Sequence, residues 1–596
     1  MIRQRVETLR KYMREAGIDI YLIPTSDFHE SEYVGGHFKA REFMSGFTGS
    51  AGTLVVTQTQ AGLWTDGRYF IQAEAQLKNS GIDLYKMGMK DVLSVEDFVI
   101  ENIPEEGKLG IDGRVINSRL GIKLEERLKE KNASISYNRD IVDEIWEDRP
   151  ALSCEPAFLL DIQYAGKSRK EKLEGLRKKL EEEKADVFIL TCLDDIAWLF
   201  NIRGNDIPYN PVVLSYVIIT KEKGYFFVNE GVLNTEIKEA FQVDQIEIMP
   251  YDAIYDFVKQ FSGTDVVLLD KGKVNYAIIR NLNPDIKIID KVNPTTLAKA
   301  VKNEVELENL RKSHLKDAVA VTKFMYWLKT KVGKEEITEI TASDYLENLR
   351  REQEGFIELS FDTICAYQEH AAMMHYSASK ETDVSLKPEG LLLVDSGGQY
   401  YEGTTDITRT FVLGSIEEEW KKHFTLVVKS MLNLANAKFL YGCTGLNLDI
   451  LARGPLWNLG IDYRCGTGHG VGYLLNVHEA PNGFRWKHVP ERNDQAILEA
   501  GMVTTDEPGV YIEGSHGIRI ENELICKKAE ENEYGQFMNF EMLTYVPIDL
   551  DGIDKQYLNS TDIEQINRYH QMVYEKVSPY LNSEEREWLQ TYTREI

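Results

Sequence analysis

Two stretches in the first part of the chain share one pattern of apolar and polar positions. LRKYMREAGIDIYLI (residues 9–23) and LRKKLEEEKADVFIL (residues 176–190) align without gaps at an offset of 167 residues. Each is a charged amphipathic segment that runs into an apolar one, which predicts a helix followed by a strand. Each is also followed by a similar strand pair, GTLVVT with GLWTDGRYFIQ and YVIIT with GYFFVNE. The pattern predicts two related α/β domains, 1–155 and 156–303.

The pattern changes at about residue 304. EVELENLRKSHLKDAVAVTKFMYWLKTKV has apolar residues near helical spacing and predicts a long helix, after which glycine-punctuated strands alternate with helices. Seven of the eleven histidines lie between residues 370 and 516, so we expect the chemistry in a third domain, 304–528.

The remaining residues, 529–596, form a predicted C-terminal extension. FMNFEMLTYVPIDL predicts a strand, and TDIEQINRYHQMVYEKV predicts a helix opened by a capping box from Thr561 to Glu564. Trp588 and Leu589 fall in a predicted final helix. The sequence leaves open whether this extension wraps its own domain or pairs with a second subunit.

Composition and charge restrict the class of protein. The 96 acidic and 69 basic residues give a formal net charge of −27, and no basic face offsets it, which disfavours nucleic-acid binding. The six cysteines lie far apart without a C-x-x-C pair, as expected of reduced thiols. The N-terminus has no apolar core for a signal peptide, and the longest apolar-rich stretch, 211–219, is too short to cross a membrane. We expect a cytoplasmic protein that binds neither nucleic acid nor membrane.

Two segments of the third domain carry paired acidic residues. In residues 390–414, Asp395 and Asp406 stand eleven apart, and in residues 501–526, Glu507 and Glu521 stand fourteen apart. Each segment reads as a strand, a glycine turn and a returning strand, so the two hairpins can bring four acids together.

Four converging carboxylates point to metal ions. Burial and mutual repulsion would protonate some of them, and divalent cations remove that penalty. His469, in CGTGHGVGYLLNVHE, adds one nitrogen to an oxygen-rich set, which favours Mn²⁺, Co²⁺, Fe²⁺ or Zn²⁺. Five such ligands fit two ions about 3.5–4 Å apart, which activate water. Each motif alone is common in turns, so the prediction depends on their ordered set, D-x10-D, H-G-x-G, D-E-P-G and R-x-E.

That ordered set resembles the pita-bread metallopeptidases, and within them the three-domain cytosolic form of the aminopeptidase P family. The resemblance extends over essentially the whole chain, with FTGSAGTLVV, LWTDGRYFIQA, MMHYSAS, GTGHGVG, NVHE and TDEPGVYIEGSHGIRIEN. It implies two creatinase-like N-terminal domains before a pita-bread catalytic domain. It also implies removal of the first residue from peptides with proline at position two, by a hydroxide activated by two divalent ions, and a homodimer. Mn²⁺ is the expected ion, with Co²⁺, Zn²⁺ or Fe²⁺ as alternatives.

The resemblance also implies a role for each matched residue. Glu507 would be both a metal ligand and the general base. The implied ligands are Asp395, Asp406, His469, Glu507 and Glu521. The implied substrate-facing residues are His375, His469, His478 and, in the first domain, Arg68. Arg519 would support Asp395. One departure is His370, which stands where related sequences would have asparagine.

Three alternatives share the fold. A prolidase has the same ligands but cleaves only dipeptides, and the two extra N-terminal domains and the long tail argue mildly against it. A non-catalytic binding protein and a metal-free creatine-hydrolysing relative are disfavoured, because all five candidate ligands are present.

Overall fold

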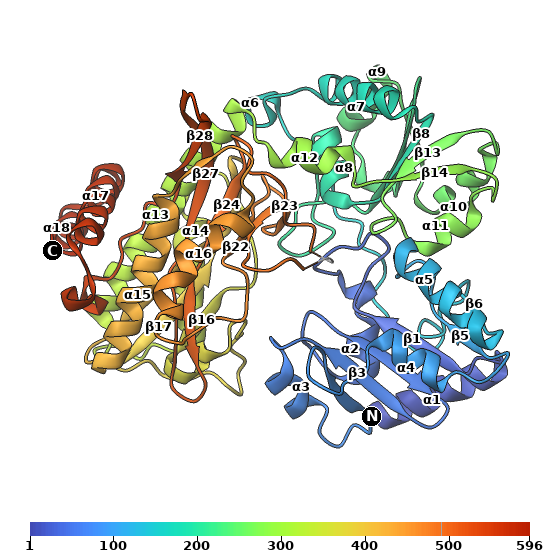
Figure 1. The fold of residues 1–596 in the computed structure, drawn as a ribbon, viewed down its shortest axis with the longest axis horizontal. Coiled ribbons are helices and arrows are strands. Elements are labelled where there is room, and N and C mark those ends of the chain that lie inside the picture. The colour runs from blue at the N-terminus through green and yellow to red at the C-terminus, as the bar shows by residue number, and fades with distance from the viewer. Residues whose placement is uncertain (490–491) are drawn as a thin grey trace. The chain divides into compact units, whose positions relative to one another are not determined.

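A computed structural model describes residues 1–489 and 492–596 (Figure 1). The chain forms two compact units. Unit 1 comprises residues 1–159 and 167–295, and unit 2 comprises residues 160–166 and 296–596. The domain boundaries predicted at 155, 303 and 528 divide the chain more finely than this and stay predictions.

Unit 1 begins with a mixed six-stranded sheet in the order β4-β3-β2-β1-β5-β6. Its strands are β1 (Ile20–Pro24), β2 (Thr53–Thr57), β3 (Ala61–Thr65), β4 (Asp83–Lys86), β5 (Lys108–Gly110) and β6 (Ser134–Ser136). Side chains alternate along β1: Tyr21 shares a buried cluster with Leu9 of α1 (Ile2–Glu15), whereas Leu22 shares another with Phe98 of α4 (Val95–Asn102). Both faces of the sheet are therefore covered. The other helices are α2 (Ala40–Ser45), α3 (Phe70–Gln76) and α5 (Ser118–Leu128).

The second sheet of unit 1 repeats the first. Its order is β12-β11-β10-β8-β13-β14, with the same parallel and antiparallel neighbours at each position. The strands are β8 (Val187–Leu190), β10 (Ser215–Thr220), β11 (Gly224–Val228), β12 (Ile246–Pro250), β13 (Val266–Leu269) and β14 (Lys287–Asp290). β8 begins 167 residues after β1 (187 − 20), so the predicted internal repeat is confirmed. The helices are α7 (Arg169–Glu183), α8 (Leu193–Phe200), α9 (Thr235–Val243), α10 (Ile254–Phe257) and α11 (Tyr276–Asn281).

Unit 2 packs helices around antiparallel sheets. The predicted long helix is present as α13 (Glu304–Lys331), and α14 (Glu339–Arg351), α15 (Glu418–Ala435) and α16 (Gly445–Trp457) follow it. Buried residues of these helices form one core with the strands. One sheet is β16 (Ile364–Tyr367), β17 (Leu391–Ser396) and β20 (Ile407–Val412); another is β15 (Phe356–Leu359), β18 (Gly398–Tyr400) and β19 (Gly403–Thr404).

The largest sheet of unit 2 has the order β21-β28-β27-β24-β22-β23. Its strands are β21 (Lys438–Leu440), β22 (Gly468–Gly470), β23 (Glu479–Phe484), β24 (Val503–Asp506), β27 (Asn522–Asn532) and β28 (Gly535–Met542), and a separate hairpin is formed by β25 (Gly509–Ile512) and β26 (His516–Arg519). β27 runs through position 528 and pairs with β28, so the strand expected in the extension belongs to this sheet.

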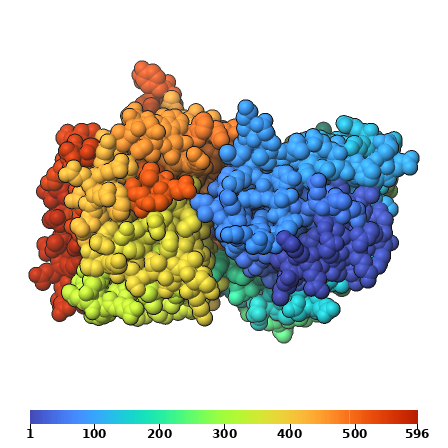
Figure 2. Space-filling model, turned by 90° about the horizontal axis from the view of Figure 1, so that it is seen from below, coloured from blue at the N-terminus to red at the C-terminus, as the bar shows by residue number. Residues whose placement is uncertain are grey.

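The C-terminal extension ends in α17 (Ser560–Val577) and α18 (Ser583–Tyr592). Ile566, Val573 and Leu589 are buried in the same core as α13 and α15, and Figure 2 shows the red C-terminal residues lying against other residues of unit 2. The extension thus packs on its own domain. The predicted capping box was wrong by two residues, because Asn559 and Asp562 cap α17 reciprocally. No described helix is long and apolar enough to cross a membrane.

Candidate metal centre

Two pairs of antiparallel strands bring the predicted acidic residues together. Asp395 lies in β17 and is paired with Thr408 of β20, and Asp406 stands directly before β20. Side chains two residues apart on a strand share a face, so Asp406 and Thr408 project to the same side.

The second pair of strands, β24 and β27, presents the two glutamates. The last residue pair of this ladder is Asp506 with Asn522. Glu507 and Glu521 are the next residues beyond that pair, so both lie at the same end of the two strands. The chain between them forms the β25–β26 hairpin.

His469 lies in β22, between β23 and β24. A side chain at Gly468 would place its Cβ 1.8 Å from the Thr505 carbonyl oxygen, so only glycine allows this approach. The Nδ1 atom of His469 lies 2.9 Å from the carbonyl oxygen of Gly470, which requires a proton on Nδ1 and leaves the Nε2 lone pair available. Nε2 lies 3.5 Å from Asp406 Oδ2 and 3.4 Å from Glu507 Oε1.

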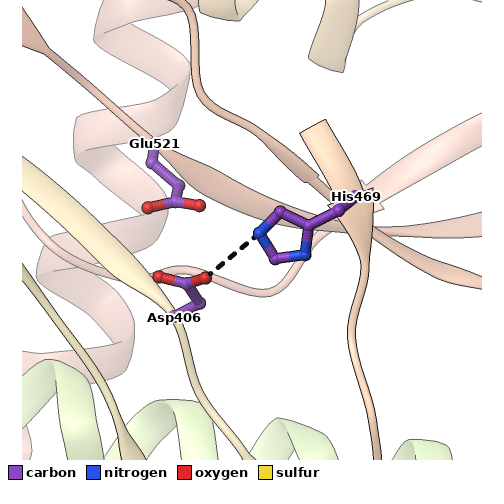
Figure 3. A group of neighbouring side chains, drawn as sticks. All are labelled: Asp406, His469 and Glu521. Atoms are coloured by element: carbon purple, nitrogen blue, oxygen red, sulfur yellow. Dashed lines mark ion pairs between the residues drawn. The ribbon is translucent and has the colours of Figure 1, made fainter. Parts of the chain in front are cut away.

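Three of the predicted ligands form a compact group. Potential ligand atoms of Asp406, His469 and Glu521 all lie within 4.8 Å of one another, and Figure 3 shows their side chains directed toward one another. Asp395 and Glu507 lie close enough to act electrostatically on Asp406 and Glu521. The structure therefore brings all five predicted ligand residues into one region.

The protein alone does not neutralise this group. Burial raises the pKa values of Asp406 and Glu521 well above their ordinary range, and the nearby carboxylates of Asp395 and Glu507 raise them further. Among the described residues, Asp395 Oδ1 and Glu521 Oε1 are buried without a hydrogen-bond partner. Buried oxygens without a partner are unfavourable unless something else satisfies them. The donor set and its unsatisfied oxygens thus fit divalent cations, which would supply both the charge and the missing bonds.

Arg519 and Thr408 hold two of these carboxylates in place. Arg519 Nη2 donates to Asp395 Oδ2 at 2.5 Å, and its Nη1 donates to the Tyr511 hydroxyl at 2.7 Å. The Thr408 hydroxyl donates to Glu521 Oε2 at 2.7 Å and accepts from Arg519 Nε at 3.2 Å. Sequence reasoning missed Thr408, although its i+2 spacing from Asp406 was a usable signal. Tyr511 had no such signal.

A buried pair behind Asp406 was also missed. The backbone N–H of Asp406 donates to Glu523 Oε1 at 2.7 Å, and His314 Nε2 of α13 lies 2.9 Å from the same oxygen. Burial alone would lower the pKa of His314, but Glu523 outweighs this effect and raises it. An isolated histidine in a helix gives no sequence signal for such a contact.

The predicted substrate-facing histidines differ in position. The His478 ring lies edge-on to His469, with ring centroids 4.2 Å apart. His375 is exposed in the segment after β16, and the carbonyl oxygen of its neighbour Met374 lies 3.5 Å from Arg519 Nη2. His370 has Nδ1 2.9 Å from Glu339 Oε1, so its ring is bound to that carboxylate.

Arg68 lies in unit 1, between β3 and α3. Its Nε and Nη2 atoms donate to the two carboxylate oxygens of Asp66, each at 2.8 Å. The structure therefore shows a local ion pair at this predicted substrate-binding residue.

Comparison with known families covers nearly the whole chain. Residues 5–145 and 148–306 each match the Creatinase/Prolidase N-terminal domain, residues 308–528 match Metallopeptidase family M24, and residues 536–596 match the C-terminal region of the same peptidase family. The fold and the buried carboxylate cluster thus define a metallopeptidase.

Whole-length relatives narrow this class. The probable Xaa-Pro aminopeptidase P of Paracoccidioides brasiliensis (strain Pb03) is 38% identical, covering 100% of this chain and 99% of its own. The X-prolyl aminopeptidase of Caenorhabditis elegans, described as a cytosolic enzyme with a di-nuclear active site, superposes with a TM-score of 0.94 at 35% identity and full coverage of both chains. The chain belongs to the Xaa-Pro aminopeptidase P family, and the predicted fold of two creatinase-like domains followed by a pita-bread domain is confirmed.

A dipeptide-cleaving relative matches less of the chain. The Xaa-Pro dipeptidase of Bacillus anthracis superposes with a TM-score of 0.51 at 25% identity, over 99% of its own length but only 64% of this chain. The comparison therefore favours the aminopeptidase over the prolidase alternative.

Proposed function

We propose that this chain is an aminopeptidase that releases the N-terminal residue from peptides with proline at position two, using two divalent metal ions. The proposed ligands are Asp395, Asp406, His469, Glu507 and Glu521. The buried carboxylate cluster carries this proposal, because two of its oxygens lack hydrogen-bond partners among the described residues. The names of the whole-length relatives support the substrate class.

Manganese is the proposed ion. Carboxylate oxygens with a single imidazole suit Mn²⁺, and Co²⁺, Zn²⁺ and Fe²⁺ are compatible with the same donors. When bound, the ions lower the pKa of coordinated water toward about 7 and so provide a hydroxide nucleophile at neutral pH. Asp406 and Glu521, which are nearly fully buried, would hold the ions together with the other three proposed ligands.

The chain's own residues supply proton transfer and charge stabilisation. Glu507 is only partly buried, and Thr505 donates to its Oε1 at 3.2 Å, so its second oxygen can take the proton of the nucleophile and pass it to the leaving nitrogen. His478, beside His469, donates a hydrogen bond to the carbonyl oxygen as negative charge develops there. His375 and His469 contribute to the substrate-facing surface, where His375 orients the peptide.

Proline at position two changes what the site must recognise. The nitrogen of an X-Pro bond has no N–H, and the ring fixes φ, so the site needs no acceptor for that proton. A free dipeptide also places a carboxylate next to the scissile bond, which a tripeptide does not. Peptide length therefore separates the two activities.

The function is tested with Ala-Pro-Ala, Ala-Pro and Ala-Ala-Ala, each assayed with chelator and with added Mn²⁺. We expect Mn²⁺-dependent release of alanine from Ala-Pro-Ala, with much slower turnover of Ala-Ala-Ala. Turnover of Ala-Pro alone would identify a prolidase instead. Absence of both turnover and specific metal uptake would support a non-catalytic binding protein.

Arg68 is proposed to contact the peptide through its remaining donor, Nη1. Two of its three guanidinium nitrogens already bond Asp66, so Asp66 would fix the orientation of the group. Arg68→Met should raise KM for longer peptides more than for Ala-Pro-Ala. If KM is unchanged at every peptide length, Arg68 does not contact the peptide and serves only in its ion pair with Asp66.

We further propose a cytoplasmic homodimer. The six cysteines are free, which suits a reducing compartment. Along α16, Leu446, Ile450 and Trp457 are each about 40–50% exposed, an apolar surface that a second copy can cover. Light scattering should give twice the mass of one chain. In Ile450→Glu, the measured mass should fall to that of a single chain.

A further inference from the structure

A buried lysine connects the loops that carry two of the proposed active-site histidines. Lys302 is 4% exposed, and its Nζ atom donates to the Val471 carbonyl oxygen at 2.6 Å and also to Glu479 Oε1. Val471 stands two residues after His469, and Glu479 directly follows His478. One ammonium group thus joins the two ends of the loop 471–479.

A second lysine completes this cluster. Lys299 Nζ lies 2.6 Å from Glu479 Oε2, and Lys299 and Glu479 are 6% and 5% exposed. Glu479 is therefore bound by two ammonium groups. Buried charges are unfavourable unless paired, and Glu479 pairs with both lysines.

The backbone around Lys302 is fixed as well. Its N–H donates to the Gly501 carbonyl oxygen at 3.0 Å, and a Cβ at Gly501 would lie 2.7 Å from the Lys302 carbonyl oxygen. Gly501 precedes β24, which leads to Glu507. Lys302 is thus anchored next to the start of β24, while its side chain holds the loop between β22 and β23.

The geometry of the two rings depends on this loop. The His469 and His478 rings meet edge to face at 4.2 Å, although eight residues of chain separate them. At the far end of the loop, Gln399 Nε2 donates to the Leu475 carbonyl oxygen at 2.7 Å. Without Lys302, the base of the loop would lose its bond at Val471 and one of the two charges that hold Glu479.

We propose that Lys302 is a positioning residue of the peptidase: by binding Val471 and Glu479 together, it fixes His478 relative to the metal ligand His469. Lys299 is an auxiliary that binds the other oxygen of Glu479. This inference rests on the proposed function for the roles of the two histidines.

Lys302→Met is the direct test. It preserves much of the side-chain volume, and Glu479 keeps its ion pair with Lys299, so the variant is expected to fold. We expect kcat on Ala-Pro-Ala to fall about 10- to 100-fold with KM changed by less than about threefold, and Mn²⁺ affinity of the apoprotein to fall about tenfold.

Lys329→Met is the matched control. Lys329 is also a lysine of unit 2 with a largely enclosed side chain, 7% exposed, and its Nζ binds Asp549 at 2.5 Å and the Val412 carbonyl oxygen at 2.6 Å. We expect Lys329→Met to lower the melting temperature about as much as Lys302→Met does. Its kcat and Mn²⁺ affinity should not change. If Lys329→Met reproduces those changes, the effect is one of general destabilisation and the proposal is rejected.

Coupling to His478 is measured by a double variant. If Lys302 acts on turnover through His478, Lys302→Met should reduce kcat little further in a His478→Ala background. Fully additive losses would overturn the proposal. So would kcat and Mn²⁺ affinity of Lys302→Met within twofold of the unmodified protein.

Two further outcomes stay distinguishable. If the unmodified protein does not cleave Ala-Pro-Ala, the proposed function is rejected. If Lys302→Met binds Mn²⁺ as tightly as the unmodified protein, the role of Lys302 is rejected independently of activity. If Lys302→Met does not fold, Lys299→Met replaces it: a several-fold loss of kcat with a melting temperature no lower than that of Lys329→Met is expected, and unchanged kcat overturns the proposal.

Discussion

Arg519 binds one oxygen of Asp395 and leaves the other available. Its Nη2 lies 2.5 Å from Oδ2, whereas Oδ1 is buried without a hydrogen-bond partner among the described residues. Arg519 is itself fixed by Tyr511 and Thr408. The arginine therefore orients the carboxylate so that Oδ1 can bind a cation, as partners behind metal ligands do elsewhere.

Replacing Arg519 should weaken metal binding. Arg519→Met removes the group that orients Asp395, so we expect Mn²⁺ affinity, measured by calorimetry on the apoprotein, to fall about 10- to 100-fold. Arg311→Met is the control, because Arg311 also pairs with a carboxylate, that of Glu541, but both residues are partly exposed. Equal losses in both variants would contradict a specific role for Arg519.

Glu507 should control turnover more than folding. Glu507→Gln keeps the side-chain volume but removes the basic oxygen, so we expect kcat to fall by about 10²- to 10⁴-fold in steady-state assays of Ala-Pro-Ala. Glu513→Gln, at an exposed position in the β25–β26 turn, should leave kcat unchanged. Hydrolysis that survives in Glu507→Gln with its metal content intact would remove Glu507 as the general base.

The sequence predicted the repeated sheets and the cluster for different reasons. The offset of 167 residues is a local pattern repeated in one chain, so it identified two related α/β domains, each of which contains a six-stranded sheet. The acids lie at or beside the ends of strands, and strand alternation made their convergence predictable. Contacts such as Glu523 with His314 join residues about two hundred positions apart, and neither residue has a local pattern that requires the other.

The start of α17 shows why local signals also fail. NSTDIE offers caps at both Asn559 and Thr561, and each is followed three residues later by an acid. Either side chain could accept a hydrogen bond from the first turn of the helix, so the sequence alone does not decide which of the two residues is the N-cap. The helix uses Asn559. Packing of Ile566 and Val573 in the core accompanies that choice.

Gly517 should be required for the position of the segment that carries His375. A Cβ at Gly517 would lie 1.8 Å from the Ala371 carbonyl oxygen, so alanine forces this segment away from β26. We expect Gly517→Ala to destabilise the protein by about 1–3 kcal/mol and to reduce kcat/KM at least about tenfold. The stability is measured by denaturant unfolding and kcat/KM by peptide assays.

Gly175→Ala is the control, because Gly175 is exposed within α7 and no atom lies near the position of an added Cβ. This substitution should be slightly stabilising. Unchanged activity in Gly517→Ala would show that the position of this segment does not matter.

A buried histidine pair should make the protein sensitive to acid. His516, at the start of β26, has Nε2 3.0 Å from His423 Nδ1, and both residues are at most 3% exposed. Burial, and then the neighbouring His423, lower the pKa of His516 from 6.5 to about 4. Between these values the unfolded state binds more protons, so the free energy of unfolding rises with pH and is lost as pH falls from 6.5 toward 4.

This loss is measurable by substitution. One such histidine contributes at most about 3 kcal/mol across that window, so His516→Asn should show a smaller decrease in melting temperature between pH 7 and pH 4.5 than the unmodified protein. His488→Asn, at an exposed position, should retain the original pH dependence. The explanation is rejected if His516→Asn and the unmodified protein lose the same stability over this range, because the protons taken up on unfolding would then bind elsewhere.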